Sequence, residues 1–132
     1  MATVSISTNA RSEVLDITDE ITQAIPDDAD GIATVFVRHT TAAVTVNEAE
    51  SRLLEDLSDA LDGLVPDTGW GHDEIDDNAD GHVRATLVGP SVTVPVSDGR
   101  PEMGTWQSIL LVECDGPRTR TIQVRTTGGQ HS

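Results

Sequence analysis

The sequence predicts a single domain in which strands alternate with two or three helices, and three observations support this. The chain has 132 residues, enough for one hydrophobic core but too few for two independent ones. Hydrophobic residues make up 36% of it and charged residues 23%, close to the average for globular domains. Some segments alternate apolar and polar residues as strands do, while others repeat apolar residues at helical spacing. No linker interrupts this pattern, so residues 1–132 are expected to fold as one unit.

Strands are predicted where side chains alternate between apolar and polar. In residues 3–8, Val4 and Ile6 fall on one side and serines on the other, as in a strand with one buried face. The same alternation, or a short apolar run, predicts strands at residues 14–15, 31–38, 43–46, 91–96, 108–114 and 120–127. Turn residues at 97–99 and 115–117 separate the last three.

The clearest helix is predicted from Glu48 to Leu64, where five leucines and Ala60 recur so that only a helix keeps them on one face. Pro66 prevents its continuation. A short helix is expected between Thr18, whose side chain can cap it, and Pro26; another should start at Asn78, again as cap. Residues 66–77 have neither periodicity, which predicts a functional loop.

Charge is the strongest compositional signal. Twenty-three acidic residues oppose 8 basic ones, all arginine, for a net charge of −15. Such a field repels phosphate backbones, so we expect no nucleic-acid partner. At ~1 M salt the Debye length falls to roughly 3 Å and the repulsion is screened, which favours a halophilic source. The single Cys114 lies in a strand-like run, and the chain has no signal segment or membrane-spanning stretch. A cytoplasmic protein without membrane association is expected.

Three histidines are candidates for chemistry. His39 follows a predicted strand, His72 lies in the loop and His82 lies in the short helix that follows. Their spacing matches no compact zinc motif, but three protein ligands with an open fourth position are common at catalytic zinc. The alternative is that they are separate surface or capping residues.

Other polar residues surround these histidines in the sequence. Thr40, Thr41, Asn47 and Glu48 follow His39 and suit an oxygen-rich ligand, although threonine is also common in strands for its propensity alone. Asp80 is close enough to His82 to fix its tautomer. Arg118 and Arg120, beside a turn, could hold a phosphate or a carboxylate through the guanidinium fork, although Arg120 could instead pair with one of the many surface acids.

Several segments together resemble the YjbQ-like family over nearly the whole chain. They are residues 39–48 (HTTAAVTVNE), 78–82 (NADGH), 91–107 ending in Gly-Thr-Trp-Gln, and 115–118 (DGPR). The resemblance implies a one-domain α+β fold, mostly antiparallel, packed as a cyclic homotrimer. It also implies a polar pocket where His39, His72 and His82 gather to hold a divalent metal, zinc or alternatively magnesium. Asn78, Asp80, Thr105, Trp106, Gln107 and Arg118 join the implied ligand-binding set.

The activity attributed to that family is secondary thiamine-phosphate synthesis, the condensation of hydroxymethylpyrimidine diphosphate with thiazole phosphate. In this hypothesis the metal polarises the diphosphate, Arg118 holds a phosphate, and His39, His82 or Glu48 moves a proton. A second hypothesis keeps the pocket for a phosphorylated small molecule and drops turnover. A third, a purely structural trimer, gives the histidines no role. In the trimer, the strand 108–114 and Trp106 are expected to bury the contact.

Overall fold

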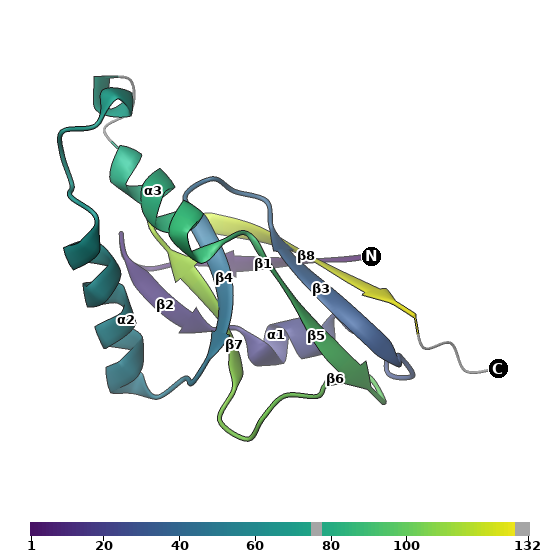
Figure 1. Ribbon diagram of the computed structural model, residues 1–132. Coiled ribbons are helices and arrows are strands. Elements are labelled where there is room, and N and C mark those ends of the chain that lie inside the picture. The colour runs from purple at the N-terminus through teal and green to yellow at the C-terminus, as the bar shows by residue number, and fades with distance from the viewer. Residues whose placement is uncertain (75–77, 129–132) are drawn as a thin grey trace.

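The computed structural model describes residues 1–74 and 78–128, which form two antiparallel sheets and three α-helices (Figure 1). The strands are β1 (Ala2–Ser7), β2 (Glu13–Asp16), β3 (Gly31–Val37), β4 (Ala42–Asn47), β5 (Ser91–Ser97), β6 (Arg100–Pro101), β7 (Ser108–Glu113) and β8 (Thr119–Thr127). The helices are α1 (Thr18–Gln23), α2 (Ser51–Leu64) and α3 (Ala79–Val88), with a 3-10 turn, η1, at Gly71–Glu74. The predicted single, mostly antiparallel α+β domain is confirmed.

The two sheets differ in size and in what covers them. The five-stranded sheet has the order β1-β8-β3-β5-β6, and the three-stranded sheet has the order β2-β7-β4. The main core lies between them, where Val35 and Ile122 of the large sheet and Leu111 of the small sheet are fully buried together with Ile21 of α1. The apolar residues of the alternating strands are therefore buried, as the sequence predicts. The residues between them point away from the core.

Helices α2 and α3 cover the other face of the small sheet. Leu54, Leu57 and Leu61 of α2 pack on a second cluster that contains Val112 of β7 and Ala85 of α3. The molecule thus has three layers: helices, small sheet and large sheet (Figure 1). No described helix lies on the outer face of the large sheet, and none is long and apolar enough to cross a membrane.

The ends of the helices differ from the sequence predictions for local reasons. The long helix begins at Ser51 because Glu50 is its N-cap and accepts a 2.8 Å hydrogen bond from the Leu53 N–H. Thr18 is not the cap of α1 but its first residue; its hydroxyl donates to Asp16 at 2.6 Å and accepts from the Ile109 N–H at 2.9 Å. Thr18 therefore ties α1 to β7 rather than capping the helix.

Candidate functional site

A cavity of about 680 Å³ opens at one end of the sheets. Its wall comes from three segments that are distant in the sequence: the loop after β3, the start of α3, and the turn before β8 together with the first residues of β8. The lining residues are Arg38, His39, Thr40, Thr41, Asn78, His82, Asp115, Arg118, Thr119 and Arg120. Three of the chain's 8 cations therefore line one cavity in a protein whose net charge is −15.

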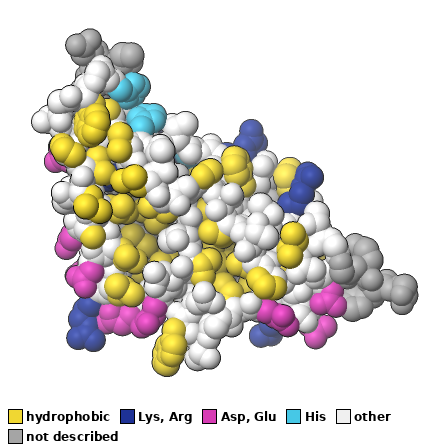
Figure 2. Space-filling view, viewed as in Figure 1, with side chains coloured by type: hydrophobic (Ala, Val, Ile, Leu, Met, Phe, Trp, Pro, Cys, Tyr) yellow, Lys and Arg dark blue, Asp and Glu magenta, His cyan; other side chains and the backbone are white. Residues whose placement is uncertain are grey.

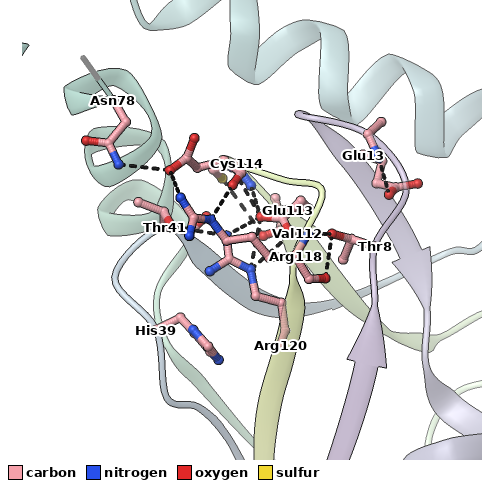
Figure 3. A network of polar contacts seen from close by, with 12 residues as sticks. Thr8, Glu13, His39, Thr41, Asn78, Val112, Glu113, Cys114, Arg118 and Arg120 are labelled. Carbon is pink, nitrogen blue, oxygen red and sulfur yellow. Dashed lines mark hydrogen bonds and ion pairs between the residues drawn. The ribbon is translucent and has the colours of Figure 1, made fainter. Parts of the chain in front are cut away.

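A buried ion pair forms the base of the cavity. Arg120 of β8 and Glu113 of β7 are 1% and 2% exposed, and the Arg120 Nε donates to Glu113 Oε1 at 2.9 Å (Figure 3). Thr8 donates to the same carboxylate at 2.6 Å, and Arg120 Nη2 donates to the Thr41 hydroxyl at 3.0 Å. Burial alone would raise the pKa of Glu113, but the hydrogen bonds from Arg120 and Thr8 hold it below its usual value. The carboxylate is therefore charged, and the remaining Arg120 nitrogen, Nη1, makes no hydrogen bond or ion pair with the described residues.

His39 ends the ladder between β3 and β8. The Arg38 N–H donates to the Thr121 carbonyl at 3.1 Å, and then the chain turns away. The Thr121 N–H therefore lacks a strand carbonyl, and it donates instead to Nε2 of His39 at 2.8 Å. Because Nε2 accepts, the neutral ring carries its proton on Nδ1. Burial and, after it, the nearby Arg120 lower the pKa of His39 and so favour this neutral form.

Arg38 is a free cation at the cavity. It is exposed, and its guanidinium forms no ion pair with any described residue. The Arg118 guanidinium, by contrast, is paired with Asp115 at 3.0 Å, and Nε donates to the Asp115 carbonyl at 2.8 Å. Arg118 thus lines the cavity but is already paired, whereas Arg38 was not among the residues singled out in the sequence.

Asn78 reaches the cavity instead of capping α3. It occupies the N-cap position but makes no capping hydrogen bond with its side chain. Its Nδ2 donates to Asp115 Oδ2 at 2.8 Å, and its Oδ1 is buried with no hydrogen-bond partner among the described residues. The predicted cap is wrong, but the side chain leaves one acceptor unsatisfied beside the cavity, which a ligand N–H or a water can use.

Asp80 anchors α3 rather than orienting His82. Its carboxylate is fully buried and accepts from Arg11 at 2.9 Å and from Arg84 at 2.5 Å. Arg84 in turn donates to the Val65 carbonyl at 2.8 Å, just beyond α2. Asp80 does not line the cavity, so its predicted ligand and tautomer roles are not supported; it positions α3 and hence Asn78 and His82.

His72 and His82 meet edge to face, with ring centroids 4.7 Å apart. His82 and His39 both line the cavity, but His72 does not. The described residues contain no group of three or more His, Cys, Asp or Glu side chains placed to hold a metal ion. Ligation needs a free imidazole lone pair, and in His39 the Nε2 pair accepts the Thr121 N–H while Nδ1 carries the proton. The predicted three-histidine zinc or magnesium set does not fit these residues, and we derive no step through a metal. Asp76 and Asp77, the carboxylates just upstream of His82 that could also fix its tautomer, lie outside the described residues.

The other predicted site residues lie at the far end of the small sheet. The register pairs Asn47 with Ser108, so Glu48 lies near residues 105–107 at the end of β4. The cavity lies at the other end of this strand, where β4 begins. A six-residue strand spans ~20 Å, and Asn47 and Glu48 close the opposite end of β4 from Thr41. Within one chain, Asn47, Glu48, Thr105, Trp106 and Gln107 therefore do not join His39. Trp106 is 73% exposed, while β7 is the internal strand of the small sheet and its residues from Ile109 to Glu113 are buried within the chain.

A family model described as "UPF0047 protein YjbQ-like" matches residues 2–129. The chain belongs to the YjbQ-like family. A UPF0047 protein of Methanothermobacter thermautotrophicus is 48% identical over 93% of this chain and 88% of its own. The UPF0047 protein YugU of Bacillus subtilis is 35% identical over 97% of this chain and 99% of its own.

Solved structures agree with the fold of this YjbQ-like chain. A hypothetical protein from Aeropyrum pernix superposes with a TM-score of 0.92 at 41% identity, covering 97% of this chain and 98% of the other. A protein of unknown function from Sulfolobus solfataricus gives a TM-score of 0.88, also at 41% identity, covering 93% and 92%. These relatives are described as hypothetical or of unknown function, so the family membership does not bring an activity with it.

Proposed function

We propose that this YjbQ-like protein binds a small phosphorylated molecule in the arginine-lined cavity, and that its own side chains hold the phosphate without a metal. The observation that supports this most is the gathering of Arg38, Arg118 and Arg120 at one cavity in a chain with 23 acidic residues. Arginines gathered in an acidic protein indicate an anionic ligand. The net negative charge of the protein repels an anion at long range, so N–H donors close to the anion must offset that repulsion.

The donors of the cavity suit a phosphoryl group. Arg38 supplies a free guanidinium, and Arg120 supplies Nη1 from a guanidinium that Glu113 holds in place. His39 contributes Nδ1–H, a neutral donor whose orientation the Thr121 N–H fixes. The unsatisfied Oδ1 of Asn78 is an acceptor, so the complete ligand should also present an N–H or O–H group.

Titration calorimetry tests this proposal with inorganic phosphate and pyrophosphate, at the lowest salt in which the chain is folded. Each titration is run with and without EDTA. We expect each anion to bind as tightly with EDTA as without it. Chloride at the same ionic strength should compete poorly. Absence of binding, or binding that returns only when zinc or magnesium is added, would overturn the proposal.

The more specific function, thiamine-phosphate synthesis, depends on the family resemblance. Its chemistry joins a pyrimidine diphosphate to a thiazole phosphate and releases pyrophosphate, and the cavity contains His39 and His82 as groups that can exchange protons. Glu48, the third predicted catalytic residue, lies outside the cavity of its own chain. A pyrophosphate-release assay distinguishes the two hypotheses. An enzyme should release pyrophosphate when both substrates are present and not with either one alone, whereas a metabolite-binding protein should release none.

A further inference from the structure

Two hydrogen-bond acceptors at one side of the cavity have no donor among the described residues. Oδ1 of Asn78 is buried and makes no hydrogen bond with the part of the chain that the structure describes. Asp115 accepts through Oδ2 from Asn78 at 2.8 Å and from Arg118 at 3.0 Å, whereas its Oδ1 makes no hydrogen bond or ion pair with the described residues. Asn78 and Asp115 both line the cavity. A buried acceptor without a donor costs free energy, which a donor on a ligand, or a water, recovers.

The donors of the cavity lie at its other side. Figure 3 shows Asn78 at the upper left of the polar cluster, with His39 and Arg120 below it and separated from it. Arg38, next to His39 in the chain, belongs to this second group. A ligand that uses both sides therefore needs two unlike ends. One is an anionic end for the arginines, and the other carries N–H or O–H groups for Asn78 and Asp115.

The charges at the cavity favour a ligand with little net charge. Three arginines line it, but Arg118 is paired with Asp115 and Arg120 with Glu113. The described residues therefore leave one uncompensated positive charge there, on Arg38. On the face shown in Figure 2, acidic side chains lie along α2 and the lower edge of the molecule, and they add repulsion for any anion. A phosphate monoester carries about −1.5 to −2 near pH 7, and an ammonium group on the same ligand brings this to between about −0.5 and −1. The single free guanidinium balances that remainder.

We propose that the cavity binds a zwitterionic phosphate monoester, whose phosphate group meets the arginines and whose ammonium group donates to Asn78 and Asp115. An ammonium group has three N–H donors, enough for both free oxygens, whereas a hydroxyl has one. Its positive charge also strengthens a hydrogen bond to the Asp115 carboxylate, which a neutral amide would do less. This amine subsite rests on the anion site of the proposed function, because the phosphate end of the ligand is held there.

Titration calorimetry with matched ligands tests the amine subsite, in the buffer used for phosphate. Phosphoethanolamine has both the positive charge and N–H groups, phosphocholine has the charge without an N–H, and ethyl phosphate has neither. We expect phosphoethanolamine to bind at least ~10-fold more tightly than ethyl phosphate, the usual gain from a charge-assisted hydrogen bond. Phosphocholine should bind less tightly than phosphoethanolamine. Aminopropyl phosphate and propyl phosphate repeat the comparison at a longer spacing, and a preference for the amine at either spacing supports the proposal.

Asn78→Ala tests the subsite from the side of the protein. The variant lacks the buried acceptor, so phosphoethanolamine should lose several-fold more affinity than ethyl phosphate does, and the preference for the amine should fall. The control is Asn9→Ala, which changes an exposed asparagine that does not line the cavity and should keep the wild-type preference. Circular dichroism confirms that each variant is folded. If Asn78→Ala does not fold, the comparison of ligands on the wild type still decides.

Three results would overturn the amine subsite and leave the anion site standing. The first is that the alkyl phosphates bind as tightly as the amines at both spacings, which would indicate that a water satisfies Asn78. The second is that phosphocholine binds as tightly as phosphoethanolamine, so that no hydrogen bond from the ammonium group is recognised. The third is an unchanged preference for the amine in folded Asn78→Ala. If none of the phosphate ligands binds, the anion site itself fails, and the amine subsite fails with it.

Discussion

The imidazole of His39 replaces a strand carbonyl for Thr121: Nε2 accepts the Thr121 N–H at 2.8 Å where the β3–β8 ladder ends. This contact requires an unprotonated Nε2, so it couples the protonation of His39 to the end of the sheet. The same contact turns Nδ1 into a donor beside the cavity. A residue that the sequence suggests as a metal ligand is thereby a hydrogen-bond donor with a fixed tautomer.

His39 should make the fold sensitive to acid. Its folded pKa lies below the ordinary value because burial and Arg120 oppose the charged ring. The unfolded chain then binds the proton more readily, so this contribution to stability is full above ~6.5 and is lost as pH falls through the lowered folded pKa. In His39→Gln, the amide oxygen can accept the Thr121 N–H without titrating. Urea unfolding between pH 5 and 8 should show a shallower loss for His39→Gln than for the wild type; parallel curves would contradict this role.

Arg38 should dominate phosphate affinity. A charge-assisted hydrogen bond is worth ~1.5–3 kcal/mol, so Arg38→Ala should weaken phosphate binding by roughly 10-fold to 100-fold. Arg38→Lys should recover part of the loss, since it restores the charge but not the planar fork. The control is Arg52→Ala, which removes an equal charge from α2, where Arg52 pairs with Glu50 away from the cavity. Calorimetry in one buffer compares them; equal losses in Arg38→Ala and Arg52→Ala would show that only net charge matters.

Gly116 should not tolerate a side chain. A Cβ there would collide with the Ala10 carbonyl and lie 2.8 Å from the Thr8 hydroxyl that holds Glu113. Gly116→Ala should therefore cost ~1–3 kcal/mol of stability through overpacking. Gly63→Ala is the matched control, because nothing lies within 4 Å of a Cβ at that helical position; it should stabilise by ~0.5–1 kcal/mol. Opposite shifts of the urea midpoint are expected, and a neutral Gly116→Ala would contradict the close packing.

The fold was predictable because its signals are local. Alternation in residues 31–38 and 120–127 identified β3 and β8, and the leucine stripe identified α2. The helix ends were less accurate because tertiary partners compete for the capping side chains: Thr18 bonds to β7, and Asn78 bonds to Asp115. Whether a side chain caps a helix depends on which alternative partner the fold brings near it.

The site was predicted only in part, because it is assembled from segments that are distant in the sequence. His39, His82 and Arg118 meet at one cavity, but Asn47 and Glu48, close to His39 in sequence, are carried away along β4. The buried pair of Glu113 and Arg120 was missed although its signal was present. Arg120 shares the inward register of Ile122 and Val124, so a buried guanidinium should require a carboxylate, and Glu113 ends an otherwise apolar run.

Folding should depend on salt, as the net charge of −15 implies. Repulsion among carboxylates opposes the compact state in dilute buffer, and ~1 M KCl reduces the Debye length to roughly 3 Å. The buried guanidinium groups of Arg84 and Arg120 are already paired with buried carboxylates, so salt acts mainly on the exposed acids. A screening gain of ~2 kcal/mol would raise the thermal midpoint by roughly 6–10 °C. Calorimetric scans from 0.1 M to molar KCl measure this, with Asp56→Asn and Asp59→Asn together on α2 as a variant that should need less salt. The same midpoint in both salts would exclude adaptation to a salt-rich cytoplasm.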